Sequence, residues 1–303
     1  MIELDVEFFR GVLEALPLGL YIVNRDGKIL FWNEGAEQIT GYLTQDVMGR
    51  AWSKELLVQR DGEGEDLEGQ FPPLLTALRD GKSVTRDVSL RHKEGHRVQV
   101  RLQAFPIRDR SGAVIGAAES FEESPYGVEW DRRQSKLEAY GCLDQESRVL
   151  NFGIMQAHLR EALGVFSEHP VPFSLLCLEI DQLEHIRTRG GVAAVRSALR
   201  VVGHSLEGAL RPTDFVGRWQ GNEFLAIVTE CSLAEITRVA DRLRRTVSSS
   251  EVRWWGDSLP LTVSVGASSV KQGDTQELLV ARAQAALRGS VAQGGDRVTL
   301  STE

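Results

Sequence analysis

The sequence predicts an α+β protein with two domains, and three observations lead to this fold class. The chain has 303 residues, about twice the length of a common domain, and 42% of them are hydrophobic, which is enough for two buried cores. Strand-like runs separated by short turns dominate residues 1–123, which predicts an antiparallel sheet. Over residues 144–303, strand-like and helical segments follow each other in the order βαββαβ.

The first domain opens with the signal of a β-hairpin. Two β-rich runs, at 16–24 and 28–32, flank the turn residues Asp26 and Gly27. Residues 33–42 then have helical character. Three further strands are predicted at 84–90, 98–107 and 114–121.

This order of strands and short helices is that of a PAS domain, and residues 27–42 resemble the most recognisable stretch of that family. The resemblance covers roughly residues 10–123 and implies a sensor of ligands or partners. It leaves the PAS ligand unknown, and the sequence indicates no certain cofactor. The first cysteine is Cys142, so a photoreceptor that forms a flavin adduct is not expected.

Residues 124–143 form a charged segment that we expect to be a linker helix between the domains. Its apolar positions are sparse: Val128, Trp130, Leu137 and Tyr140 do not sustain two full heptads. Two interpretations remain open, a solvated spacer and a helix that pairs with its twin in a dimer.

The second domain begins with a buried strand at 173–180, followed by a helical stretch to about residue 210. Strands at 215–219 and 223–228 flank Gly221 and Asn222, a pair suited to a hairpin turn. The remaining predicted elements are a helix over 233–247, a strand at 261–267 and a helix over 276–289.

Residues 211–224 resemble the signature hairpin of the GGDEF family of diguanylate cyclases. Where the family has Gly-Gly-Asp-Glu-Phe, this chain has Gln220, Gly221, Asn222, Glu223 and Phe224. The similarity covers about residues 142–300 and implies a nucleotidyl-cyclase-like βαββαβ domain. We therefore expect a PAS sensor domain at 1–123, the linker at 124–143 and a degenerate GGDEF domain at 144–303.

The resemblance implies that an active relative would condense two GTP molecules with the help of a divalent metal. The family's two metal-binding acids correspond here to Glu179 and Asn222. Mg²⁺ prefers anionic oxygen ligands, and the amide removes one negative charge from the pair. We expect this to be a vestigial site without a metal.

The implied phosphate and guanine contacts are also altered. Glu184, Val291 and Gly295 stand where the family has cations for the triphosphate. Arg187 and Arg196 stand where it has an Asn and an Asp for guanine, and an arginine cannot accept the guanine protons. Because metal, phosphate and base are all affected, no catalytic residue is predicted and the domain is expected to be inactive.

One binding motif of the family is kept in full. Arg211 and Asp214 match its Arg-x-x-Asp inhibitory site for cyclic di-GMP, and Arg242 aligns with a second arginine, with Arg238 one turn earlier. A guanidinium suits a phosphate or a guanine edge, and a carboxylate can accept guanine N–H groups. The alternative is structural, with Asp214 capping or starting the strand and Arg211 a solvated cation at a helix end.

Composition limits the partners. A net charge of −8 and a pI near 5.4 argue against general nucleic-acid binding. No apolar run is long enough for a membrane span and no secretion signal is evident, so a cytoplasmic protein is expected. The PAS–GGDEF resemblance also implies a homodimer.

We expect a signalling regulator that binds cyclic di-GMP or contacts an unidentified signalling protein under PAS control. Two alternatives remain: an active diguanylate cyclase that makes cyclic di-GMP from two GTP, and an interaction scaffold that binds no nucleotide.

Overall fold

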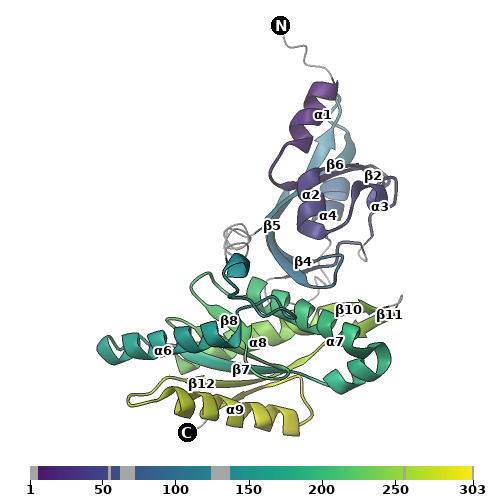
Figure 1. Ribbon diagram of the computed structural model, residues 1–303. Helices are drawn as coiled ribbons and strands as arrows, with labels where there is room; N and C mark the ends of the chain where they lie inside the picture. The colour runs from purple at the N-terminus through teal and green to yellow at the C-terminus, as the bar shows by residue number, and fades with distance from the viewer. Residues whose placement is uncertain (1–5, 54–55, 62–71, 124–136, 255–256, 302–303) are drawn as a thin grey trace. The chain divides into compact units, whose positions relative to one another are not determined.

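The computed structural model describes residues 6–53, 56–61, 72–123, 137–254 and 257–301 (Figure 1). They form two compact units, one made of described residues up to 123 and one of those from 137 on, with residues 95–97 grouped with the second. Most of the expected linker, including Val128 and Trp130, lies outside the described residues. None of the helices in the described ranges is long and apolar enough to cross a membrane.

The first unit is built on a six-stranded antiparallel sheet with the strand order β2-β1-β6-β5-β4-β3. Its strands are β1 (Gly19–Asn24), β2 (Ile29–Trp32), β3 (Gln59–Asp61), β4 (Val84–Arg91), β5 (Arg97–Arg108) and β6 (Val114–Glu123). Its helices are α1 (Val6–Glu14), α2 (Glu34–Thr40), α3 (Thr44–Val47) and α4 (Pro73–Asp80).

Asn33 shows how the sequence sets the fold of this unit. Its side-chain oxygen accepts from Ala36 N at 2.9 Å, which caps α2, and from Leu20 N at 2.8 Å, which ties the helix start to β1. Gly41 ends α2 in the left-handed conformation at φ 72°, a position that favours glycine. Asn33 therefore connects the hairpin and the first helix that the sequence predicts, because its side chain bonds to the backbone of both.

The second unit contains a five-stranded sheet with the order β13-β12-β7-β9-β8 and a separate two-stranded ribbon, β10-β11. The strands are β7 (Ser174–Ile180), β8 (Phe215–Arg218), β9 (Glu223–Val228), β10 (Glu251–Trp254), β11 (Asp257–Pro260), β12 (Val263–Ser269) and β13 (Val298–Leu300). The helices with given bounds are α6 (Phe152–Glu168), α7 (Leu183–Gly208), α8 (Leu233–Ser248) and α9 (Gln276–Ala292).

Helices cover both faces of the second sheet, as Figure 1 shows for α8 and α9. Alternate residues of β7 enter two cores: Leu176 and Leu178 pack with α7 and α8, whereas Leu175 and Cys177 pack with α6 and α9. This burial on both faces explains why the β7 sequence is an uninterrupted apolar run. The α+β fold class predicted from the sequence is confirmed.

Candidate functional site

The altered signature residues lie at the turn between β8 and β9. Gly221 occupies the left-handed region at φ 50°, and Glu223 N donates to Gln220 O at 2.7 Å, which closes the turn. Phe224 is fully buried, because β9 continues from the turn into the core. The hairpin thus keeps its fold and brings Asn222 to the end of β7.

The structure brings the two predicted vestigial metal positions together. Asn222 Nδ2 donates to Glu179 Oε1 at 3.0 Å and approaches Ile180 O at 3.5 Å. Glu179 also faces Glu223 across the β7–β9 pair, and Glu223 Oε2 accepts from Gln284 Nε2 at 2.9 Å. Amide groups therefore contact both carboxylates at this end of the sheet.

These contacts decide whether the pair fits a magnesium ion. Glu179 Oε1 and Ile180 O are both hydrogen-bond acceptors. The amide of Asn222 therefore points its nitrogen, and not its oxygen, toward Glu179. Rotation of the amide would offer its oxygen to a metal, but the amide is neutral, so the pair supplies one negative charge where two acids would supply two. With one anionic oxygen ligand in place of two, the Glu179–Asn222 pair fits the divalent metal that the GGDEF resemblance implies less well than two acids would.

Asp181, the second acid at the end of β7, serves the fold. Its carboxylate accepts from Thr262 Oγ1 at 2.7 Å, Ser264 Oγ at 2.6 Å and Asp296 N at 3.0 Å. These bonds tie the end of β7 to the start of β12 and to the turn before β13. A Cβ on Gly295 would lie 2.9 Å from Asp181 Oδ1, so this position in the turn has no room for a larger residue.

The positions expected to bind guanine in an active relative carry exposed ion pairs. Arg187 Nε lies 3.2 Å from Glu184 Oε1, and Arg196 Nε lies 3.8 Å from Glu146 Oε1. Exposed pairs of this kind stabilise a fold little. Each arginine faces a carboxylate and carries no hydrogen-bond acceptor, so it cannot bind the N–H groups of a guanine.

Arg211 and Asp214 lie in the turn between α7 and β8. The Asp214 side chain is buried: Oδ2 accepts from Arg211 N at 3.1 Å, and Oδ1 accepts from Thr229 N at 3.0 Å. The carboxylate thus stabilises its own turn and the end of β9, whereas Arg211 is exposed. These bonds favour a structural role for Asp214, and its contact with cyclic di-GMP stays a prediction.

Helix α8 places a second arginine near Arg211. Ser232 and Glu235 form a capping box at its start, with Ser232 N donating to Glu235 Oε2 at 2.9 Å. Hydrogen bonds from Ser232, with smaller contributions from the charges of Arg211 and Arg238, lower the pKa of Glu235. Arg211 and Arg238 are therefore both close to Glu235, and both are exposed, whereas Arg242 is half-buried.

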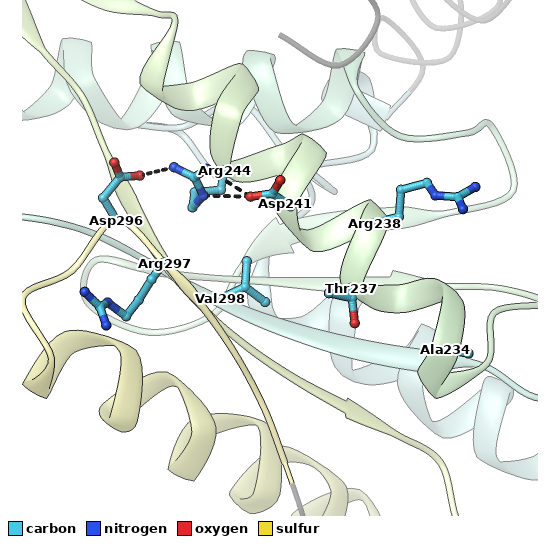
Figure 2. Close-up of a pocket in the computed structure, with 8 residues that line it drawn as sticks. All are labelled: Ala234, Thr237, Arg238, Asp241, Arg244, Asp296, Arg297 and Val298. Atoms are coloured by element: carbon cyan, nitrogen blue, oxygen red, sulfur yellow. Dashed lines mark hydrogen bonds and ion pairs between the residues drawn. The ribbon is translucent and has the colours of Figure 1, made fainter. Parts of the chain in front are cut away.

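An open groove of about 600 Å³ lies between α8 and the segment entering β13, and Arg238 is one of its lining residues (Figure 2). Arg244 lies between Asp296 at 2.7 Å and Asp241 at 2.9 Å. Partial burial opposes its charge, but the hydrogen bonds to these two carboxylates outweigh that effect, so the pKa of Arg244 is raised. This arginine is fixed by its partners, whereas Arg238 extends away from them in Figure 2.

The sheet order, the hairpin turn and the flanking helices define a nucleotidyl-cyclase-like domain. Comparison with known families gives a match to "Diguanylate cyclase, GGDEF domain" over residues 142–297 and a match to "PAS fold" over residues 13–123. The chain belongs to the GGDEF family, with a PAS domain ahead of the GGDEF domain. This architecture confirms the resemblance drawn from the sequence, whereas the exact boundaries at 123 and 144 stay a prediction.

Curated proteins that are similar to this chain include diguanylate cyclases. Diguanylate cyclase A of Treponema denticola is 29% identical over 151 residues, covering 50% of this chain and 40% of that protein. Diguanylate cyclase DgcP of Pseudomonas aeruginosa is 28% identical over 284 residues, covering 89% of this chain and 41% of that protein. The chain thus spans about two fifths of the length of these relatives.

Among solved structures, diguanylate cyclase SiaD from Pseudomonas aeruginosa in complex with its activator SiaC is similar. The TM-score is 0.52 and the identity is 26%, over 57% of this chain and 70% of that chain.

Proposed function

We propose that this chain is a cytoplasmic regulator in cyclic di-GMP signalling whose GGDEF domain does not synthesise the dinucleotide. In this proposal the domain binds cyclic di-GMP as a receptor, or contacts a signalling protein, under control of the PAS domain. The observation that carries the loss of synthesis is the pairing of Glu179 with the neutral amide of Asn222. This pair lacks one of the two anionic ligands that a catalytic metal would have between two acids.

Retention of a nucleotide ligand is supported by the exposed arginines near the capping box of α8. The charges of Arg211 and Arg238 both act on Glu235, and guanidinium groups bind phosphate oxygens well. Asp214 contributes by fixing the turn that carries Arg211. The dinucleotide would thus be held mainly through its phosphates, by cations rather than by a carboxylate.

Contact with another protein is the second proposed output. A solved relative, SiaD, forms a complex with its activator protein, which supports protein contact as a way of controlling domains of this kind. For the present chain we propose only that its partner is a signalling protein, without naming that protein. A homodimer is part of the same proposal, since the PAS–GGDEF resemblance implies one.

Calorimetric titration of the full chain with cyclic di-GMP tests the receptor proposal. We expect micromolar binding that falls at least about tenfold in Arg211→Ala, because a charge-assisted contact contributes about 1.5–3 kcal/mol. Arg238→Ala should weaken binding in the same direction. Arg160→Ala, an exposed arginine on α6, is the matched control and should bind as the unaltered chain does.

GTP with Mg²⁺ is the comparison ligand. If the chain binds neither cyclic di-GMP nor GTP, the receptor proposal is rejected. A scaffold that acts by protein contact then remains. Conversion of GTP into cyclic di-GMP would reject the whole proposal in favour of an active cyclase.

A further inference from the structure

Glu119 is a fully buried carboxyl group in the core of the first unit. It lies in the middle of β6, opposite Tyr21 of β1 and Ala104 of β5, and its exposed fraction is 0%. Its neighbours along the inward face of β6, Ala117 and Phe121, are core residues. A carboxyl group is seldom found in such surroundings without a partner that compensates for the loss of water.

The partners of Glu119 are hydrogen-bond donors from other strands. The Tyr21 hydroxyl and Gln59 Nε2, the latter at 3.2 Å, both donate to Glu119 Oε2. Gln59 belongs to β3, at the edge of the sheet, and β5 and β4 lie between β6 and β3 in the strand order. The backbone N–H of Leu74, in the first turn of α4, also stabilises the charged form.

Among the described residues, no cation acts on this carboxyl group. The surrounding elements present Tyr21 from β1, Ala104 from β5 and the Leu74 amide from α4, and β3 carries Arg60 and Asp61 after Gln59. Burial is the largest effect and outweighs the hydrogen bonds, which raises the pKa of Glu119 to about 7. The group can therefore gain or lose its proton near neutral pH.

Two acceptor atoms of the same cluster show what a proton would change. Glu119 Oε1 and Gln59 Oε1 are both buried without a hydrogen-bond partner among the described residues. When Glu119 is ionised it is an acceptor, and the Gln59 amide nitrogen faces it. When it is protonated it is a donor, and rotation of the Gln59 amide by a half-turn presents an oxygen to that donor.

We infer that Glu119 is a proton-operated switch of the PAS domain, which reverses the hydrogen bond between β6 and the edge strand β3. The proton binds the carboxylate, and the carboxyl O–H then donates to Gln59 Oε1, which replaces the hydrogen bond from Gln59 Nε2 to Glu119 Oε2. No covalent bond other than this O–H bond forms or breaks. Strand β6 ends at Glu123, immediately ahead of the segment that leads along the chain to the GGDEF domain. The switch does not depend on whether that domain binds a nucleotide.

The test is a pH titration of the full chain followed by NMR, with labels on the glutamate carboxyl carbons and the glutamine amide nitrogens. We expect the Glu119 carboxyl signal to titrate with a midpoint near pH 7, and the Gln59 amide signal to shift with the same midpoint. Glu119→Gln should abolish the Gln59 shift. Glu122→Gln, an exposed neighbour on β6, is the control and should leave both midpoints unchanged.

Two further variants keep the inference open to refutation if Glu119→Gln fails to fold. Tyr21→Phe and Gln59→Leu each remove a donor that stabilises the ionised form, so both should raise the midpoint of Glu119. A Glu119 midpoint below pH 5 would overturn the switch. So would a Gln59 amide signal that stays constant while Glu119 titrates.

Discussion

Asn222→Asp should convert a hydrogen-bonded pair into two adjacent carboxylates. In the present chain Asn222 Nδ2 and Glu179 Oε1 are 3.0 Å apart and both side chains are half-buried. The substitution removes one hydrogen bond, a loss of about 1 kcal/mol. Two charges at that distance repel by at most about 5.5 kcal/mol at an effective dielectric constant of about 20, and proton uptake and solvent reduce this.

We therefore expect Asn222→Asp to lower the free energy of unfolding of the GGDEF domain by about 2 kcal/mol at pH 7.5, or about 4–8 °C in thermal midpoint. Millimolar Mg²⁺ or Mn²⁺ should restore the midpoint of the variant, since two carboxylates fit a divalent metal.

The assay is thermal unfolding with and without metal, and Asn222→Ala serves as the control. This control loses the hydrogen bond but gains no charge, so it should be destabilised and insensitive to metal. The reasoning fails if the unaltered chain is stabilised by metal as much as Asn222→Asp is, because one carboxylate and an amide would then bind the ion as well as two carboxylates do.

Three further results are expected. Arg282→Ala should cost about 2–4 kcal/mol in chemical denaturation, because it leaves the carboxylate of Asp274, 6% exposed, without the 2.6 Å partner that offsets its burial. Gly266→Ala should destabilise the second unit by more than about 2 kcal/mol in the same assay, since the added Cβ would lie 2.1 Å from Leu287 N. Burial raises the pKa of Glu119 to about 7, above the unfolded value, so the contribution of Glu119 to stability should be greatest below about pH 4.5 and fall by up to about 1.4 kcal/mol per pH unit toward pH 7. Denaturation of Glu119→Gln should lack this dependence.

Much of the second domain could be predicted from the sequence because its strands are distinct. The apolar run of β7, the hairpin around Gly221 and the strand near 263–269 all lie where the sequence indicates, within two or three residues. The pairing of Glu179 with Asn222 followed from the family register. The direction of their hydrogen bond did not, because it depends on the Ile180 carbonyl, which no sequence pattern reveals.

Other features had weak or absent signals. Helix α6 and the β10–β11 ribbon were not predicted: the helix buries only Met155 and Leu159 of its 17 residues, and the ribbon strands have four residues each. The Glu119 cluster was also missed. Its one signal was a charged residue at an inward position of an alternating strand, whereas Gln59 belongs to a three-residue strand that leaves little pattern.

Asp214 shows that a sequence motif alone does not separate a binding role from a structural role. The spacing of Arg211 and Asp214 fits both a dinucleotide site and a turn. Only the bonds from Arg211 N and Thr229 N reveal that the carboxylate is already engaged.

Incubation of the purified full chain with GTP and Mg²⁺ or Mn²⁺, followed by mass spectrometry for cyclic di-GMP, tests the central claim most directly. The pairing of Glu179 with a neutral amide in place of a second acid predicts no product above a protein-free control under conditions in which a working diguanylate cyclase converts its GTP. Catalytic accumulation of cyclic di-GMP, with several turnovers per chain, would contradict the account.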